Sequence, residues 1–415
     1  MTKESKSALV ATRRFPEFIG RTLREIQFDD ATAESTIRNG DRLLPASVMG
    51  VTKAEGIVPM EERIIASDIA RYKIVQKDWF AYNPMRLNIG SIARWHGEAD
   101  ILVSPDYVVF RCLDDPDSGV HPAYLDHFRQ SAAWDAFVSE GGDGGVRVRI
   151  YYKDLARLRL VLPPRAEQQK IADCLTSLDE VIVTQLRKVE ALTVYKRGLM
   201  QQLFPREGET LPRLRFSEFR DGPKWSAVTL NQVVEIASGQ VDPTLTPYCD
   251  LPHVGGDNIE SQSGNILDVK TARELRLRSG KYPFDQRDIL YSKIRPALNK
   301  VASPDFPGIC SADIYPIRPS RRELSREYLL HLLRSGEFLV YATKHSERSK
   351  IPKINRETLL AYGARIPSVV EQQRIAACLS SLDVMIGAAS QKLDSLRAHK
   401  KGLMQQLFPS PEEAP

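Results

Sequence analysis

The sequence has none of the short motifs by which most enzymes of this length are recognised. There is no GxxxxGK[ST] phosphate loop, no GxGxxG after a predicted strand, no HExxH and no GxSxG turn. One short match to an acidic nuclease site, Asp268-Val269-Lys270, has no counterpart elsewhere in the chain, and a match of that length is expected by chance. We therefore expect a chain without catalytic residues and without a metal site.

Cysteine is scarce, and long apolar runs are missing. The cysteines are scattered singly without a CxxC pair, so neither a zinc site nor a disulfide framework is predicted. No apolar run reaches the length of a transmembrane helix, and the polar segment Met1–Arg14 lacks the apolar centre of a signal peptide. These absences predict a cytoplasmic protein that does not enter a membrane. The five cysteines are Cys112, Cys174, Cys249, Cys310 and Cys378.

Neither sign of charge dominates. Lys+Arg number 58 and Asp+Glu 53, which gives a net charge of +5. Such a mild excess permits nucleic-acid binding but does not by itself argue for it. The 415 residues are enough for several domains with their own cores.

A long internal repeat is the strongest signal in the chain. The eight residues Gly198–Pro205 return unchanged as Gly402–Pro409, an offset of 204 residues. At that offset Leu162–Pro205 aligns with Ile366–Pro409 without a gap, and 23 of the 44 positions are identical. A repeat of this length indicates two similar structural units.

Each copy of the repeat predicts one long helix. Its apolar residues alternate spacings of four and three, which is typical of a coiled-coil seam that pairs with another helix. Ser368 and Glu371 have the form of a capping box, and Pro205 and Pro409 would stop the helices. Two matching seams favour pairing within the chain. The predicted pairing residues are Ile171, Leu175, Leu178, Ile182, Leu192, Leu199 and Leu203, and then Ile375, Leu379, Leu382, Ile386, Leu396, Leu403 and Leu407.

Weaker echoes extend the repeat beyond the helices. Arg14-Phe15-Pro16-Glu17-Phe18 resembles Arg215-Phe216-Ser217-Glu218-Phe219, and the regions between such anchors have diverged. We therefore expect an α/β (α+β) chain in which two similar mixed domains are joined by two long antiparallel coiled-coil helices. The expected boundaries are a first domain at 13–161, a first helix at 162–205, a linker at 206–221, a second domain at 222–365 and a second helix at 366–409.

Short strands and helices are predicted inside both domains. Runs of apolar residues between Gly, Pro, Asn and Asp clusters are typical of strands, and helical patterns follow at 121–137 and 327–341. The predicted strands are Arg71–Val75, Ile101–Val103, Tyr107–Cys112, Val233–Ala237, Ile289–Ser292 and Ile314–Ile317.

A chain with two similar but diverged modules suits an asymmetric target. Duplex DNA has local two-fold symmetry, and DNA-binding dimers read half-sites about one helical turn apart. Two unlike modules on a rigid helical spacer would read a bipartite sequence with a fixed gap. Two other classes stay open on this reasoning: a nuclease or methyltransferase with an unrecognised site, and a protein scaffold that does not contact DNA.

The repeated motifs resemble those of type I restriction-modification specificity subunits. The resemblance lies in the start of each long helix, in its Gly-Leu-Met-Gln-Gln-Leu-Phe-Pro ending, and in the openings of the second module. It covers both halves, although the first module lacks the tryptophan of the pattern and has Asp78-Trp79-Phe80 in place of the usual Asp-Ile-Leu. The motifs of the second module are Leu214–Phe219, Trp225–Leu230 and Asp288–Ser292.

The resemblance implies a non-catalytic specificity subunit that binds no cofactor itself. Its two target-recognition domains would bind double-stranded DNA, and its helices would set the gap and dock two methyltransferase subunits. Those partners would carry S-adenosylmethionine and methylate adenine. Two restriction subunits, which carry ATP and Mg, are implied as optional further partners.

Two segments of each module are candidates for DNA contact. The first is the polar turn before each long helix, where glycines allow a close approach to phosphate and cations reach phosphate or guanine. The second follows the Asp-containing strand, where Arg and Asn are the residues that commonly read guanine and adenine. The alternative interpretation for each residue is a solvated charge or a salt bridge, and Trp95, His96 and His253 are expected to be structural. The turn residues are Gly144, Arg147, Arg149, Arg348, Lys350 and Lys353; the others are Arg86, Asn88, Arg94, Lys293, Arg295, Asn299 and Lys300.

Overall fold

A computed structural model of the chain describes residues 13–61, 65–115, 119–140, 149–320, 322–346 and 350–408. These residues form two compact units. Unit 1 contains the described residues up to Thr184 and from Lys392 onward, and unit 2 is Gln185–Gln391. Within the described ranges, no helix is both long and apolar enough to cross a membrane.

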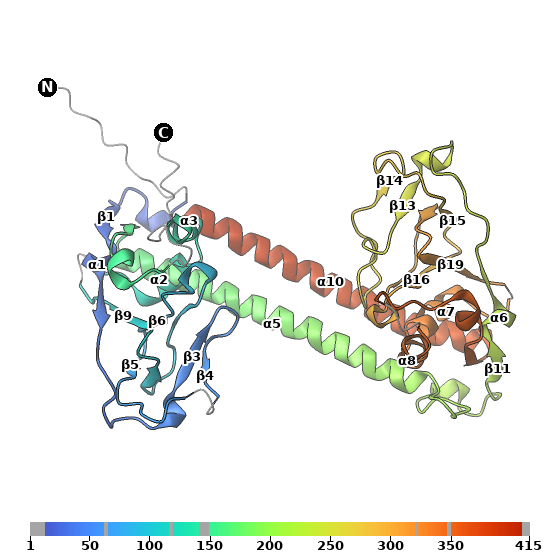
Figure 1. Cartoon of the computed structure of the whole chain (residues 1–415), viewed down its shortest axis with the longest axis horizontal. Helices are drawn as coiled ribbons and strands as arrows, with labels where there is room; N and C mark the ends of the chain where they lie inside the picture. The colour runs from blue at the N-terminus through green and yellow to red at the C-terminus, as the bar shows by residue number, and fades with distance from the viewer. Residues whose placement is uncertain are drawn as a thin grey trace. The chain divides into compact units, whose positions relative to one another are not determined.

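Unit 1 contains a four-stranded antiparallel sheet with strand order β2-β9-β6-β7, together with the smaller pairs β1-β10, β3-β4 and β5-β8 (Figure 1). Its strands are β1 (Arg24–Gln27), β2 (Thr32–Ser35), β3 (Met49–Thr52), β4 (Gly56–Pro59), β5 (Lys73–Val75), β6 (Phe80–Tyr82), β7 (Ile92–Arg94), β8 (Ile101–Val103), β9 (Val108–Cys112) and β10 (Arg159–Leu162). Its short helices are η1 (Pro16–Phe18), α1 (Phe28–Ala31), η2 (Pro45–Ser47), η4 (Leu87–Ile89), α2 (Pro122–Phe128), α3 (Ala132–Glu140) and α4 (Tyr152–Leu155).

Unit 2 repeats this plan, but it has a second four-stranded sheet in addition to the first. Its sheet β12-β19-β16-β17 corresponds to β2-β9-β6-β7 and its pair β11-β20 to β1-β10, while a second sheet has the order β14-β13-β18-β15. Its strands are β11 (Ser226–Thr229), β12 (Val234–Ile236), β13 (Pro252–Val254), β14 (Lys270–Thr271), β15 (Tyr282–Phe284), β16 (Ile289–Ser292), β17 (Val301–Ala302), β18 (Gly308–Cys310), β19 (Ile314–Pro319) and β20 (Gly363–Ile366). Its short helices are η5 (Ser217–Phe219), α6 (Leu230–Val233), η6 (Tyr248–Asp250), η7 (Pro296–Leu298), α7 (Arg326–Leu333), α8 (Gly336–Lys344) and α9 (Arg356–Leu360).

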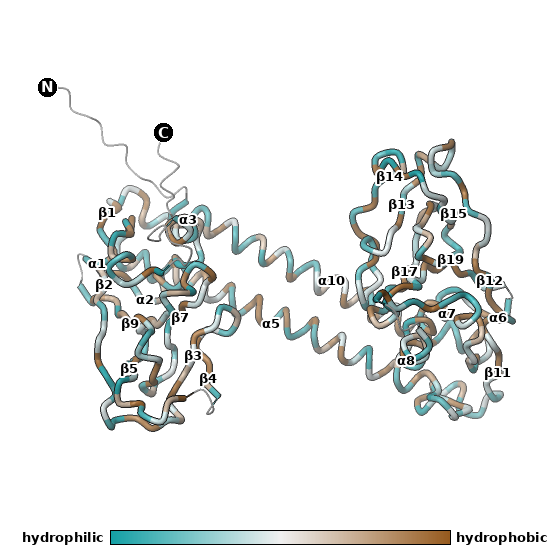
Figure 2. The backbone as a smooth tube through the Cα atoms, viewed as in Figure 1, coloured by the Kyte–Doolittle hydropathy of each residue, from teal (hydrophilic) through white to brown (hydrophobic). Residues whose placement is uncertain are grey.

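Two helices of 39 residues, α5 (Arg165–Leu203) and α10 (Val369–Leu407), each begin in one unit and end in the other. Hydrophilic and hydrophobic residues alternate along both, as Figure 2 shows. Every predicted pairing residue is buried or half-buried. Within unit 1 the start of α5 pairs with the end of α10, and within unit 2 the end of α5 pairs with the start of α10. The predicted fold class, with two long antiparallel helices, is confirmed.

The ends of the seam also belong to the globular cores. Ile171, Leu175 and Leu407 pack in one buried cluster with residues of the unit 1 sheet, among them Phe110. Leu203, Ile375 and Leu379 do the same in unit 2. The seam therefore joins each helix pair to its domain as well as one helix to the other.

The glutamate at the start of each long helix holds an arginine of the Arg-Phe echo. Glu371 accepts hydrogen bonds from Nε and Nη2 of Arg215, both at 2.8 Å, and from Nε1 of Trp225 at 3.3 Å. Glu167 accepts in the same way from Arg14, with Nε to Oε1 at 3.0 Å and a second contact from Nη2. Because the carboxylate of Glu371 is used here, the predicted capping box is only half formed: Ser368 Oγ accepts from Glu371 N at 3.4 Å.

The next residue, a fully buried glutamine, ties each long helix to a short one. Gln372 donates Nε2 to the carbonyls of Pro367 and Glu323, and its Oε1 accepts from the N–H of Ser325, the N-cap of α7. Gln168 makes the equivalent bonds in unit 1, and its Oε1 accepts from the N–H of His121, the N-cap of α2. The repeated Glu-Gln motif is therefore a structural joint.

The helical patterns predicted at 121–137 and 327–341 are present, but neither segment is one continuous helix. Each segment is two helices, α2 and α3 in unit 1 and α7 and α8 in unit 2. The break occurs at a serine, because Ser131 Oγ accepts from Trp134 N and Ser335 Oγ accepts from Phe338 N, both at 3.3 Å. A serine at this position competes with the helical hydrogen bonds before it and caps the helix after it.

Candidate nucleic-acid interface

In unit 2 the two predicted DNA-contacting segments lie side by side. Arg295 N donates to Pro352 O at 2.7 Å, and Ile354 N donates to Lys293 O at 2.9 Å. Between these bonds Ile294 and Lys353 form an antiparallel bridge. The residues after β16 and the turn before α9 therefore form one continuous surface, although they are far apart in sequence.

Unit 1 brings the equivalent segments together in a similar way. Ile150 N donates to Pro84 O at 3.0 Å, which places Arg149 beside the residues that follow β6. The predicted Gly144 and Arg147 lie outside the described residues, as does Arg348 of unit 2.

The surface of unit 1 is built around η4. Arg86 is its N-cap and Gly90, with φ of 88°, closes it in a conformation that favours glycine. Arg86, Asn88 and Arg149 are exposed, and within the described ranges no partner contacts their side chains. Lys53, at the turn between β3 and β4, also reaches this surface, since its Cγ would lie 3.3 Å from a Cβ placed on Gly90. Sequence reasoning missed Lys53, because only the folded hairpin brings it here.

Arg94 has a different place. Its guanidinium lies 3.3 Å from Asp78 Oδ1 and 3.5 Å from Asp126 Oδ2, and its side chain is 13% exposed. Arg94 is therefore paired with carboxylates of its own unit, and the exposed His96 Nδ1 lies 3.3 Å from its Nη2. Burial, with Arg94 as a second cause, lowers the pKa of His96.

On the corresponding surface of unit 2, Arg295 and Lys350 are exposed without a described side-chain partner, and Lys353 is exposed beside them. Both Arg295 and Asn299, which flank η7, adopt the left-handed conformation with φ of 48° and 50°. This turns the backbone sharply at each end of η7.

The other predicted residues of unit 2 are used inside the fold. Asn299 is buried and donates Nδ2 to Gln262 Oε1 at 3.3 Å. Lys300 donates Nζ to the carbonyl of Gly256 at 2.6 Å, and Lys293 donates Nζ to that of Ala312 at 2.8 Å. Their ammonium and amide groups thus hold the loops behind Arg295 in place.

Two of the residues expected to be structural are the half-buried Trp95 and the buried His253. Trp95 donates Nε1 to Ala99 O at 2.7 Å. His253 is buried in β13, and burial with the nearby Lys281 lowers its pKa to about 4. No group of three His, Cys, Asp or Glu in the described ranges is placed to hold a metal ion.

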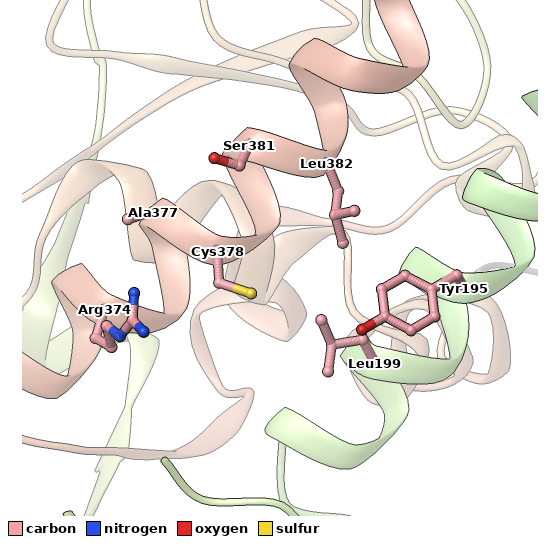
Figure 3. Close-up of a pocket in the computed structure, with 7 residues that line it drawn as sticks. All are labelled: Tyr195, Leu199, Arg374, Ala377, Cys378, Ser381 and Leu382. Carbon is pink, nitrogen blue, oxygen red and sulfur yellow. The ribbon is translucent and has the colours of Figure 1, made fainter. Parts of the chain in front are cut away.

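The long helices offer a second kind of surface. In unit 2 a groove of about 360 Å³ is lined by Tyr195 and Leu199 of α5 and by residues of α10 (Figure 3). Tyr195 is 62% exposed, and Val194 and Val384 are more than half exposed on the same helices. These exposed apolar residues and the groove lie on the same two helices within unit 2. The lining residues of α10 are Arg374, Ala377, Cys378, Ser381 and Leu382.

Comparison with known proteins agrees with this architecture. Residues 223–398 match a family described as type I restriction modification DNA specificity domain. The chain is 28% identical over 294 residues to the type I restriction enzyme EcoDI specificity subunit of Escherichia coli, an alignment covering 65% of each chain. It is 26% identical over 268 residues to the MjaVIII specificity subunit of Methanocaldococcus jannaschii, covering 62% of each chain. The chain thus matches a little under two thirds of the length of these relatives.

Solved structures share the fold. The S subunit of a type I restriction-modification system from M. genitalium superposes with a TM-score of 0.61 at 12% identity, over 96% of this chain and 99% of that one. A chain from a study of complex assembly and conformational transition of the type I R-M system gives a TM-score of 0.55 at 16% identity, over 94% and 98%. The predicted resemblance is confirmed: residues 223–398 match the type I DNA specificity domain, and the chain is similar to type I specificity subunits.

Proposed function

We propose that this chain is the non-catalytic DNA specificity subunit of a type I restriction-modification complex. The globular part of each unit reads one half of an asymmetric, bipartite and gapped DNA site. The observation that carries this proposal is the repeated frame: both units bring the same two segments together, but present different side chains there. Two different half-sites require different side chains presented by the same backbone arrangement.

The exposed cations and amide supply the chemistry of recognition. Arg86 and Asn88 in unit 1 and Arg295 in unit 2 are of the types that pair with guanine and adenine edges. Lys53, Arg149, Lys350 and Lys353 suit phosphate, where most contacts of such proteins go. Arg94, Lys293, Asn299 and Lys300 support this surface from inside the fold.

The helices are proposed to set the gap and to dock two methyltransferase subunits through the exposed apolar residues around Tyr195 and Val384. Those subunits would carry S-adenosylmethionine and methylate adenine, and nuclease subunits with ATP and Mg would complete a restriction enzyme. We place the recognition domains at 13–161 and 222–365, the helices at 162–205 and 366–409, and the linker at 206–221. The complex would act in the cytoplasm.

Sequencing that detects methylated adenine in the source genome, with and without this gene, tests the proposal. A bipartite, gapped methylation motif should vanish with the gene and return when the gene is restored. An unchanged methylation pattern, together with no salt-dependent DNA binding by the purified complex, would indicate a scaffold. Methyl transfer or cleavage by the purified chain alone would show that it is an enzyme.

A further inference from the structure

Two matching polar clusters interrupt the apolar contacts of the long helices. In unit 2 Lys196 of α5 forms an ion pair with Asp383 of α10. In unit 1 Lys400 of α10 lies 2.7 Å from Asp179 of α5. Lys400 and Asp383 stand 204 residues after Lys196 and Asp179, so the two pairs are the same contact in the two copies of the repeat.

A histidine connects each cluster to the globular part of its unit. His331 Nε2 lies 3.0 Å from Ser380 Oγ in unit 2, and His127 Nε2 lies 3.0 Å from Thr176 Oγ1 in unit 1. These residues are also 204 apart in pairs, and both histidines are buried. Unit 2 adds Arg334, whose Nη1 is 3.6 Å from Asp383 Oδ2.

A third polar contact joins two residues that are equivalents of each other. Gln185 of α5 donates Nε2 to the backbone carbonyl of Ala389 in α10 at 2.8 Å, and both residues are buried. Ala389 stands 204 residues after Gln185. The two equivalent positions of the repeat therefore contact each other, with the large Gln185 on one helix and the small Ala389 on the other.

Packing of the helix ends in the two cores favours one alignment of α5 and α10, but the apolar residues of the seam do not define that alignment by themselves. Leucines and isoleucines recur every seven residues, so a slip of one heptad would still bury apolar side chains. The same slip would move each lysine about 10 Å along the helix, away from its aspartate. The half-buried charges would then lack partners, and an unpaired buried charge is costly.

We propose that the pairs Lys196–Asp383 and Lys400–Asp179, with the Gln185–Ala389 contact, form a register lock that fixes which residue of α5 faces which residue of α10. These are positioning residues, and their effect on DNA is the length of the gap between the half-sites. This consequence rests on the proposed function, whereas the lock itself does not.

A set of substitutions can distinguish an effect of these ion pairs on helix register from an effect on the stability of the whole fold. Replacing a buried ion pair by apolar residues of similar size is often neutral or stabilising. The full-length variant with Lys196, Asp383, Lys400 and Asp179 all changed to Leu, and with Arg334 changed to Gln as at the equivalent Gln130, should therefore remain folded but lose its single register. The matched control changes Lys188 and Lys392 to Leu, because these exposed lysines are also repeat equivalents on the same helices.

Disulfide trapping measures the register without DNA. Gln185→Cys is combined with Ala389→Cys, or with Leu382→Cys or Leu396→Cys, which stand seven residues away on either side. In the otherwise native chain and in the control, only the 185–389 bond should form. In the Leu variant, bonds from 185 to 382 or 396 should appear, and their share should rise about tenfold, which corresponds to about 1.4 kcal/mol of register preference. An unchanged trapping pattern would overturn the register lock.

Methylation by the assembled complex then tests the consequence. The native chain should give one gap length, and the Leu variant should methylate sites with additional gap lengths. The charge-exchanged variant with Lys400→Asp and Asp179→Lys, in the unit where Gln130 stands in place of Arg334, should keep the single gap. If trapping shows slipped helices but the gap stays single, the register does not set the gap and that part of the proposal fails. If the native chain itself gives no gapped motif, the proposed function fails, while the trapping result still decides the lock.

Discussion

Unit 1 and unit 2 have the same frame and different faces. The order β2-β9-β6-β7 is repeated as β12-β19-β16-β17, and the buried Glu-Gln joint recurs at 167–168 and 371–372. The surfaces next to η4 and η7 differ, since the first carries Arg86 and Asn88 and the second Arg295. The comparison indicates that the shared sheet and its buried hydrogen bonds maintain the fold, while the exposed residues beside η4 and η7 can differ.

The two units also differ in the number of side chains that contact their equivalent buried or half-buried carboxylates. Glu371 accepts from both Arg215 and Trp225, whereas Arg14 is the side chain that donates to Glu167. The aspartate of the unit 2 cluster contacts Arg334 as well as Lys196, while Gln130 takes the place of that arginine in unit 1 and contacts Lys400. Unit 2 therefore has an additional donor at each of these two carboxylates, Trp225 at Glu371 and Arg334 at Asp383, and the following predictions test that comparison.

The largest effect is expected from Glu371→Ala. The substitution leaves the nearly buried Arg215 unpaired and Trp225 Nε1 without its acceptor, and breaking a buried pair costs about 3–5 kcal/mol. Glu167→Ala should cost unit 1 somewhat less, because it strands Arg14 alone. Hydrogen exchange measured separately over unit 1 and unit 2 checks the order. Glu218→Ala, which removes an exposed pair with Arg374, is the control and should change little; equal losses in the two units would contradict the comparison.

His331→Gln should reduce the acid sensitivity of unit 2. Burial, with Lys196 and Arg334 as further causes, lowers the pKa of His331 from 6.5 to about 3. The unfolded chain therefore binds the extra proton between these values, so stability is complete above pH 6.5 and falls as pH drops toward 3. The loss is about 3 kcal/mol at pH 4.

Denaturant unfolding of unit 2, followed by hydrogen exchange from pH 7 to pH 4, measures this slope. The exposed His345→Gln is the control and should leave the slope unchanged. His127→Gln should act on unit 1, where burial and Lys400 lower the pKa of His127. An unaltered pH slope in His331→Gln would show that another group controls acid unfolding.

Arg295→Ala and Arg86→Ala should each weaken the complex at one half-site only. A lost base contact costs about 1–3 kcal/mol and relaxes specificity at that position, whereas a lost phosphate contact lowers the salt slope by about 1. Binding of the assembled complex to DNA with either half-site altered measures which unit reads which half. Lys224→Ala, an exposed lysine away from this surface, is the control. Identical losses on both altered DNAs would break the assignment of one half-site to each unit.

The smallest effects are expected from the serines that divide the short helices. Ser335→Ala and Ser131→Ala each remove a cap bond and should destabilise α8 or α3 by about 1 kcal/mol. Hydrogen exchange of the first turn of each helix is the measurement. Substitution of the nearby half-buried Ser346, which donates Oγ to Thr343 O and caps no helix start, serves as the comparison.

The sequence alone determined the repeat, the two long helices and the class of fold. These follow from local periodicity: apolar residues at spacings of three and four specify one helical face, and a second copy of that face supplies its partner. It also identified two segments per module whose exposed residues include Arg86, Asn88, Arg295 and Lys350.

Only the tertiary structure decided which of the candidates are free to meet a ligand. Arg94 and Asn299 occur in the right segments, but their partners Asp126 and Gln262 are distant in sequence, so no local pattern could show that they are used internally. In the same way, Glu371 has the spacing of a capping box and instead binds Arg215, 156 residues away. Burial and pairing arise from contacts between distant residues, because a charged side chain takes whichever partner the fold brings within reach.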